Sequence, residues 1–551
     1  MKKIVLLLFI AAGLFAAEIP VNINDDVYGF LQRMENKGVI NLNAAVFPYT
    51  RNKVAHLLDK IDFSRSLLSQ TESEILDEHL ADYRMELRSH RHASLEKEDN
   101  GLLAPVFSED GTARIASNIF SRRNEAEAAH LLTFEQGNVF LWGDIGLRIE
   151  QQWKNSHSRL LLSDRYVLQG GLSDNLFFHA DFFRYQRENN PNFNELTKEE
   201  IGNWSMQQPG GSFTFDNVYS SLVYHKDNLN IGLYHQPLRW GTSERNSLIL
   251  SAYASPFSYL GFDYQYKALQ FSFFHGALLN DSTKIKKADF ATRNREKYIA
   301  GHRIDLALFD GAARIGLSEM IIYGDRNIEP GYLIPVNFFW SIEHSLMDRD
   351  NSLLALDFQT NIIPNGTIYG TLFIDELRFD ELFDQWWANK HGLQLGIRYS
   401  HHIFGKPTNW TGEASFIRPW TYSHKFFINN YTNNGISLGF PYAGNSQLYE
   451  ITNRTFINRR TKLSLVYTHL KHGYDEDDQY YGGDPTISYE RRNEIYDNAT
   501  EWLMGDLRTT ELLTLNLRYE FYNDAYLKLE MIKHLSGEQN LFINTALNLD
   551  F

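Results

Sequence analysis

The chain has 551 residues, more than the roughly 100–200 of one ordinary domain, and aromatic residues make up 14% of it. It has no cysteine, which excludes a disulfide framework, thiol catalysis and cysteine-ligated zinc. The net charge of −15 argues against nucleic-acid binding, because that needs a basic surface. After residue 17 no segment approaches the ~18 apolar residues of a spanning helix. A hydrophobic content of 43% with only 22% charged residues excludes a disordered chain.

Residues 1–17 have the pattern of a secretory signal peptide. Two lysines precede an apolar run over residues 4–15, and two alanines follow at the expected cleavage site. An uncleaved anchor is the alternative, but this run is too short to cross the hydrocarbon core of a bilayer. We therefore expect an exported protein of the bacterial envelope.

Residues 18–100 have the apolar spacing of helices. Apolar residues recur at helical spacing before Gly38, which stands where a C-cap glycine ends a helix. Thr50 is placed to cap a second helix, and Thr71 with Glu74 has the capping-box pattern for a third. We predict a small, charged helical unit that ends in a polar linker.

Residues 101–551 change to a period of two. The clearest case runs from Glu511 to Tyr522, where leucines and aromatics take one face and polar side chains the other. Such alternation indicates antiparallel strands with one apolar face, which occur in soluble sandwiches as well as in membrane barrels. The connections between the strands distinguish these two classes.

Tight turns and long polar connections alternate along this part of the chain. A barrel with short periplasmic turns and long outer loops produces this asymmetry, whereas a sandwich has no reason to. The long segments are 276–300, 324–351, 419–449 and 472–510. The tight turns are Ser173-Asp174-Asn175, Lys226-Asp227-Asn228, Lys267-Ala268, Asp310-Gly311, Pro364-Asn365-Gly366, Gly405-Lys406-Pro407, Arg459-Arg460 and Asn523-Asp524.

Aromatic residues stand close to the tight turns, as in a girdle at the membrane–water boundary. They are Tyr224, Tyr266, Phe309, Phe404 and Phe521. With both barrel ends on the periplasmic side, eight turns imply eighteen strands. A ninth candidate turn, Gln136-Gly137-Asn138, would make twenty. We predict a mainly β protein: a transmembrane antiparallel barrel of about eighteen strands (sixteen to twenty), with the helical unit in the periplasm.

Three segments resemble the Wzi-type capsule assembly family. The first contains Trp240, Gly241, Ser247, Pro256 and Phe257. The other two are residues 419–439 and 331–335, the latter followed downstream by 350–354, and the helical region over 28–58 is also similar to the family's N-terminal region. After Trp240-Gly241 this chain has Thr-Ser-Glu-Arg, where the family often has Pro and Gly.

The resemblance implies an outer-membrane barrel with a periplasmic helical unit. It also implies a surface lectin that holds capsular polysaccharide on the cell, and it brings no catalytic residues. The expected partners are surface polysaccharide, outer-membrane lipid and the polysaccharide export machinery, with no nucleic acid.

Aromatic and planar side chains in the long outer loops are the candidate polysaccharide contacts. Sugar C–H faces stack on rings, and arginine pairs a carboxylate in a bidentate way, so Arg491 and Arg492 suit an acidic polymer. The candidates are Trp420, Tyr422, His424, Tyr431, Tyr480, Tyr481, Arg491, Arg492 and Trp502. Trp386-Trp387 is a further possible sugar platform. Ordinary loop packing is the alternative for each of them.

A passive porin for sugars or other small solutes is the alternative function. Charges on the polar faces, Arg314, Arg398, Arg518 and Glu520, would then tune a channel. An infolded loop would plug it instead. A hydrolase is the weakest idea, because no acid–base pair can be placed. We predict no enzyme activity, no cofactor and no metal site.

Overall fold

The computed structural model describes residues 18–90, 103–105, 112–116, 130–136, 139–193, 195–197, 199–201, 205–280, 296–376, 384–476, 478–538 and 540–550. The expected signal peptide and most of the expected linker lie outside these ranges. Among the described residues, no helix is long and apolar enough to cross a membrane.

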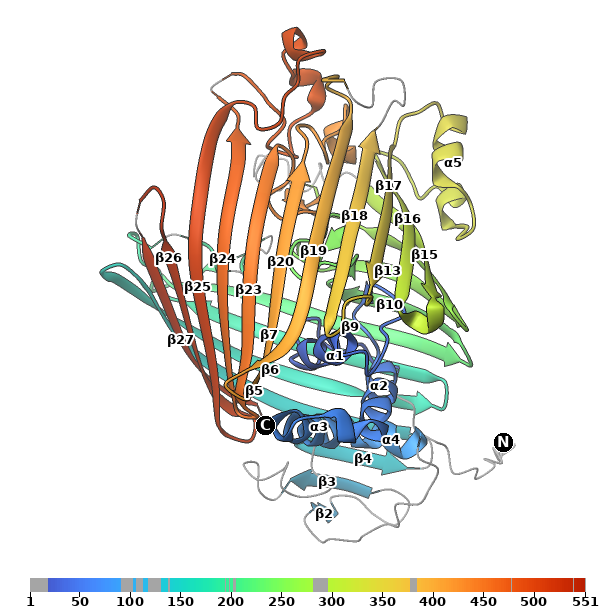
Figure 1. Ribbon diagram of the computed structural model, residues 1–551, viewed down its shortest axis with the longest axis vertical. Coiled ribbons are helices and arrows are strands. Elements are labelled where there is room, and N and C mark those ends of the chain that lie inside the picture. The colour runs from blue at the N-terminus through green and yellow to red at the C-terminus, as the bar shows by residue number, and fades with distance from the viewer. Residues whose placement is uncertain are drawn as a thin grey trace.

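Eighteen antiparallel strands form a closed barrel (Figure 1). The ring closes where β27 pairs with β5, from Phe542 opposite Lys154 to Asp550 opposite Gly146. The strands are β5 (Val139–Lys154), β6 (His157–Ser173), β7 (Leu176–Arg187), β9 (Phe213–Lys226), β10 (Leu229–Gln236), β13 (Phe257–Tyr266), β14 (Leu269–Ala277), β15 (Lys297–Leu308), β16 (Ala313–Gly324), β17 (Asn351–Thr360), β18 (Gly366–Glu376), β19 (Lys390–Ile403), β20 (Lys406–Ile417), β23 (Ser446–Asn458), β24 (Thr461–Tyr474), β25 (Asp506–Tyr522), β26 (Ala525–His534) and β27 (Leu541–Asp550).

All eight predicted tight turns join neighbouring strands of this ring, which confirms the count of eighteen. The ninth candidate adds no strand to the ring. It precedes β5, whose first residues pair with β4 (Leu132–Gln136), while the rest of β5 pairs with β27. Strand β3 (Thr112–Ala116) pairs with β4, and strand β2 (Leu103–Pro105) pairs with β3, so the two extend this pairing beyond the ring. Two connections at the outer end are short: residues 155–156 and 535–540.

The outer wall of the barrel is apolar and its inner wall is polar. On β16, Ile315 and Leu317 face outward and are about half exposed, while the alternating Arg314, Gly316 and Ser318 are buried inside. The aromatic residues at the tight turns point outward: Phe309 is 81% and Phe404 99% exposed. This is the arrangement of a membrane barrel with an aromatic girdle.

The described part of the N-terminal unit, residues 18–90, contains four α-helices: α1 (Val27–Asn36), α2 (Arg51–Phe63), α3 (Gln70–Asp82) and α4 (Arg84–His90). Gly38 follows α1 with a φ of 70°, and the Thr50 hydroxyl accepts from Lys53 N at the start of α2, as predicted. The predicted capping box at Thr71 and Glu74 is wrong. The box is Ser69 with Glu72, two residues earlier, because Glu72 also pairs with two cations from α1 and its C-cap.

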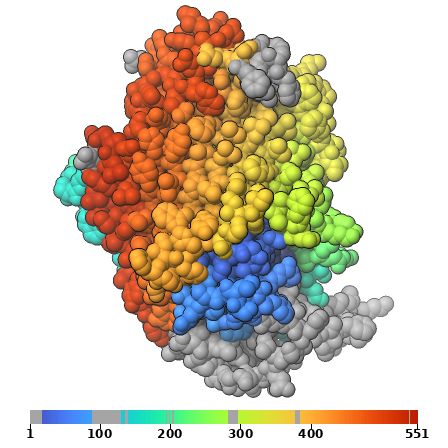
Figure 2. All heavy atoms as spheres, in the orientation of Figure 1, coloured from blue at the N-terminus to red at the C-terminus, as the bar shows by residue number. Residues whose placement is uncertain are grey.

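The N-terminal unit sits at the short-turn end of the barrel, where the blue spheres of Figure 2 lie below the yellow and orange wall. Arg33 of α1 donates to Thr408 O at 2.9 Å and to Asn409 Oδ1 at 2.7 Å. Asn36 donates to Ser400 Oγ and accepts from Thr367. The unit is therefore fastened to the wall at the periplasmic mouth.

The connection between β10 and β13, residues 237–256, folds into the barrel and is called here the infolded segment. Its two short strands, β11 (Arg239–Trp240) and β12 (Leu250–Ser251), form a sheet with β1 (Val46–Phe47) of the N-terminal unit. Trp240 and Leu248 are buried against inward-facing apolar residues of the wall and against the loop between β20 and β23. A large part of the hydrophobic core thus lies inside the barrel.

Candidate functional site

Two outer connections bring aromatic rings and arginines together at the end of the barrel opposite the tight turns. The connection from β18 to β19 supplies two tryptophans, and the connection from β24 to β25 supplies the rest. We call these six residues the outer rim cluster: Trp386, Trp387, Tyr480, Arg491, Arg492 and Trp502. All six are partly or fully exposed.

Arg492 is held in place on the face of Trp387. Its guanidinium carbon lies 3.8 Å from the centre of that ring, and its Nε and Nη2 donate to the Asp497 carboxylate at 2.8 and 3.1 Å. The backbone N–H of Trp387 donates to Asp497 O at 2.8 Å. Because one carboxylate and one ring fix the guanidinium, its orientation is set before any ligand arrives.

Neighbouring contacts continue the same pattern across the rim. Arg491 lies 4.2 Å over the Tyr480 ring, and Tyr480 forms a backbone bridge with Arg492. The buried Arg418 donates to Trp386 O and lies 5.6 Å from the Trp502 ring. The cluster therefore offers ring faces and fixed cations, which suit stacking on a sugar and pairing with its carboxylate.

Five of the predicted contact residues are buried instead. They are less than a tenth exposed and present no ring face to the outside: Trp420, Tyr422, His424, Tyr431 and Tyr481. Tyr422 and Tyr431 donate to the backbone of the infolded segment, at Leu248 O and Ile249 O, and so hold that segment in place. Burial, together with the nearby charges of two lysines, lowers the pKa of His424 to about 3, so its ring is neutral at physiological pH. The observed contacts of these five residues are those of loop packing.

The family-like segment is the start of the infolded segment. Gly241 has a φ of 110° and donates to Ala45 O at 3.0 Å. A Cβ there would lie 2.6 Å from the Ser247 hydroxyl, which itself bonds Trp240 O. Phe257 is buried among the apolar residues inside the barrel, and Pro256 lines a cavity in the lumen. These residues shape the inside of the barrel rather than its outer surface.

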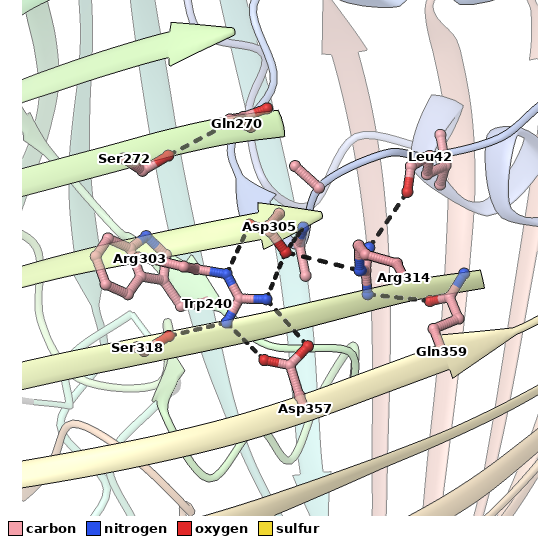
Figure 3. Close-up of polar contacts among 12 residues, drawn as sticks. Leu42, Trp240, Gln270, Ser272, Arg303, Asp305, Arg314, Ser318, Asp357 and Gln359 are labelled. Carbon is pink, nitrogen blue, oxygen red and sulfur yellow. Dashed lines mark hydrogen bonds and ion pairs between the residues drawn. The ribbon is translucent and has the colours of Figure 1, made fainter. Parts of the chain in front are cut away.

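A buried network of charged side chains lies on the inner face of β15, β16 and β17 (Figure 3). The Arg303 guanidinium donates to both oxygens of Asp305 and of Asp357, at 2.6 to 3.0 Å, and also to Ser318. All three charged groups are fully buried. Next to them, Arg314 donates to Leu42 O of the N-terminal unit. This network joins β15, β16 and β17 and reaches the N-terminal unit.

The remaining lumen holds a polar cavity of about 1180 Å³. It runs between the N-terminal unit, the infolded segment and the wall formed by β5–β9 and β23–β27. Charges of both signs line it, including Arg148, Arg165, Asp181, Arg518, Lys528 and Asp550.

Three of the four charges that we expected to tune a channel contact the inserted segments. Arg314 donates to Leu42 O, Arg398 donates to Thr242 O, and Arg518 pairs with Asp26 at 3.3 Å. The fourth, Glu520, accepts from the Asp524 backbone at the periplasmic turn. The three arginines therefore fasten the N-terminal unit and the infolded segment to the wall.

A family model for the capsule assembly protein Wzi matches residues 141–532. The chain belongs to the Wzi capsule assembly family. The chain is accordingly an outer-membrane protein, whose closed barrel has an apolar exterior. No curated protein matches the chain.

Among solved structures, the chain is similar to Wzi of Escherichia coli, with 13% identity and a TM-score of 0.58. The match covers 97% of this chain and 99% of that one. That protein is described as an outer-membrane protein involved in group 1 capsule assembly and as a carbohydrate-binding β-barrel. OprD of Pseudomonas aeruginosa is more distant, with 9% identity and a TM-score of 0.41 over 74% of this chain and 94% of its own.

Proposed function

We propose that this protein binds capsular or related surface polysaccharide through the outer rim cluster and anchors it at the cell surface. The observation that carries the proposal is the fixed Arg492 on the face of Trp387, beside the exposed Arg491. Membership of the capsule assembly family supports it, as does the carbohydrate binding ascribed to the Escherichia coli protein of the same fold.

The interior of the barrel supports anchoring over transport. The infolded segment and the N-terminal unit meet inside the lumen and are bonded to its wall. Among the described residues, these two insertions occupy much of the lumen and leave the polar cavity of about 1180 Å³ beside them. For the N-terminal unit, we favour closure of the periplasmic mouth over contact with the export machinery, since Arg33 and Asn36 bind the wall.

Binding of the producing strain's own acidic surface glycan to the purified protein tests the proposal. In Trp387→Ala and Arg492→Ala, we expect the Kd to rise at least tenfold, which corresponds to ~1.4 kcal/mol. Trp410→Ala and Arg460→Ala are matched controls. Trp410 lies on the outer wall of β20 near its tight turn, and Arg460 lies in the turn between β23 and β24.

The controls should bind as the parent does, and an unrelated neutral glycan should bind more weakly than the producer's glycan. Unchanged affinity in both rim variants, with the barrel folded, would show that the outer rim cluster is not the binding site. Equal binding of both glycans would reject a specific lectin function.

A further inference from the structure

The lipid-facing side of β14 to β16 is covered near its outer end. Outward residues alternate along β16, and Ile315 and Leu317 are exposed, but the next ones, Glu319, Ile321 and Tyr323, are buried. Phe273 of β14 and Ala300 of β15 are buried in the same way. Tyr332 of η6 (Pro330–Leu333) and Phe339 of α5 (Phe339–Ser345) pack on them from outside. Figure 1 shows α5 on the outside of the barrel, beside β15 to β17.

The covered area contains a contact between two ionisable side chains, which lipid alone would not tolerate. The His302 Nε2 and Glu319 Oε2 atoms lie 3.0 Å apart on the outward face. The backbone N–H groups of Phe339 and Trp340 donate to the two Glu319 oxygens at 2.9 and 2.8 Å. Charged groups on a lipid face need such cover, so the connection between β16 and β17 is a fixed part of the wall.

The depth of this cover follows from the strand geometry. A tilted strand climbs ~2.5 Å along the membrane normal per residue, and the apolar belt of an outer-membrane barrel is ~25 Å tall. Counting from Ala313 at the tight turn, Glu319 lies ~15 Å and Ile321 ~20 Å above the periplasmic edge of the belt. The start of α5 therefore lies at the level of the outer half of the belt.

The exposed side chains of the connection change from apolar to polar in the outward direction. The segment that leads to the Glu319 contacts of Phe339 and Trp340 exposes apolar residues: Leu333, Ile334, Val336, Phe338 and Trp340. Along α5 and toward the start of β17, most exposed residues are polar: Ser341, His344, Ser345, Asp348 and Arg349, with Met347 as an exposed apolar residue among them. This is the order in which a membrane offers acyl chains and then head groups.

We propose that Leu333 to Trp340 forms an interfacial anchor whose exposed apolar side chains lie among the acyl chains of the outer leaflet. The occupant is lipid because the patch is continuous with the lipid-facing belt of the barrel, marked by the exposed Ile315 and Leu317 below it. The connection replaces the part of the belt that it covers, and it extends the area of barrel that contacts lipid.

The absence of cysteine from the whole sequence allows single labelling sites. Val336→Cys, at a position that is 83% exposed, would carry an environment-sensitive fluorophore in protein reconstituted into phosphatidylcholine vesicles. We expect doxyl groups on the acyl chains to quench this label strongly, while aqueous iodide quenches it weakly. Leu317→Cys in the belt is the lipid-exposed reference, and Ile495→Cys, at an 80% exposed outer-loop position, is the water-exposed reference.

Each labelled variant must keep the heat-modifiable gel migration of a folded barrel, and Phe338→Cys serves as a second site if Val336→Cys does not. A label that behaves like the one at Ile495, quenched by iodide and not by doxyl lipid, would overturn the proposal. A label that neither agent quenches, together with cross-linking between two copies at Val336→Cys, would overturn it in favour of a protein interface. Ser345→Cys should be quenched by shallow doxyl groups more than by deep ones.

Discussion

The backbone of Val46 pairs with that of Trp240 inside the barrel. Val46 belongs to the unit that enters from the periplasmic mouth, and Trp240 to the segment that enters from the outer end. The two insertions therefore form one plug, made of a small sheet and a shared apolar cluster. A substitution on either side of this contact should therefore alter the structure at the other mouth of the barrel.

Gly241→Val should loosen the plug. The glycine has a φ of 110°, which is strained for any other residue, and a Cβ would lie 2.6 Å from Ser247 Oγ. We expect the infolded segment to leave its place in a folded barrel, so the single-channel conductance in planar bilayers should rise several-fold. Gly405→Val is the matched control, because Gly405 also has a positive φ but has open space around it.

New sensitivity of the infolded segment to protease would show that the segment is displaced in Gly241→Val. If the conductance of that variant is then the same as that of the parent, the plug does not limit ion flow. A large conductance of the unmodified protein would favour the porin function instead.

Removal of one carboxylate from the luminal network should destabilise the barrel strongly. In Asp357→Ala, the two buried arginines Arg303 and Arg314 share the single carboxylate of Asp305, and an uncompensated buried charge costs ~3–5 kcal/mol. Asp506→Ala is the control, since it breaks the exposed pair with Arg508 and should cost less than ~1 kcal/mol. Denaturant unfolding of both variants in detergent micelles measures the difference; equal midpoints would show that the network carries no net stability.

The barrel could be predicted from the sequence because its constraints are local. Lipid outside and polar groups inside force a period of two, and short turns with aromatics mark one end of every strand pair. All eight turns, including Asp310-Gly311 and Asn523-Asp524, lie where predicted. The start of α3 was missed because Ser69 with Glu72 and Thr71 with Glu74 have the same spacing. Only the tertiary contact of Glu72 with Arg33 distinguishes them.

The plug and the binding candidates depend on contacts between distant parts of the chain. Tyr422 and Tyr431 have the residue type of a sugar platform, yet each donates to a backbone oxygen more than 170 positions away. Aromatic residues serve packing and stacking equally well, so composition cannot separate the buried ones from the exposed Trp502. The role of Asp497 in fixing Arg492 has no sequence signal beyond its position five residues later.

The attachment of the N-terminal unit should weaken in acid through Glu72. Burial alone would raise the pKa of this carboxyl, but the charge of Arg33, the Ser69 N–H and Lys37 outweigh it and lower the pKa to about 2. A carboxyl with a lowered pKa contributes stability that is complete above its ordinary pKa of ~4.3 and is lost as the pH falls through the lowered value. We therefore expect the hydrogen-exchange protection factors of the α3 amides, each measured against the intrinsic rate at the same pH, to fall progressively between about pH 4.5 and pH 2.

Glu72→Gln should remove most of this pH dependence and lower the protection factors of α3 already at neutral pH, because Arg33 then lacks its charged partner near the wall. Glu74→Gln, on the same helix and next to Gln70 at the surface, should leave both the rate and its pH profile unchanged. If the acid-induced loss of protection persists in Glu72→Gln, another carboxyl carries it. In that case the attachment does not depend on the Arg33–Glu72 pair, although Arg33 still bonds the backbone of β20.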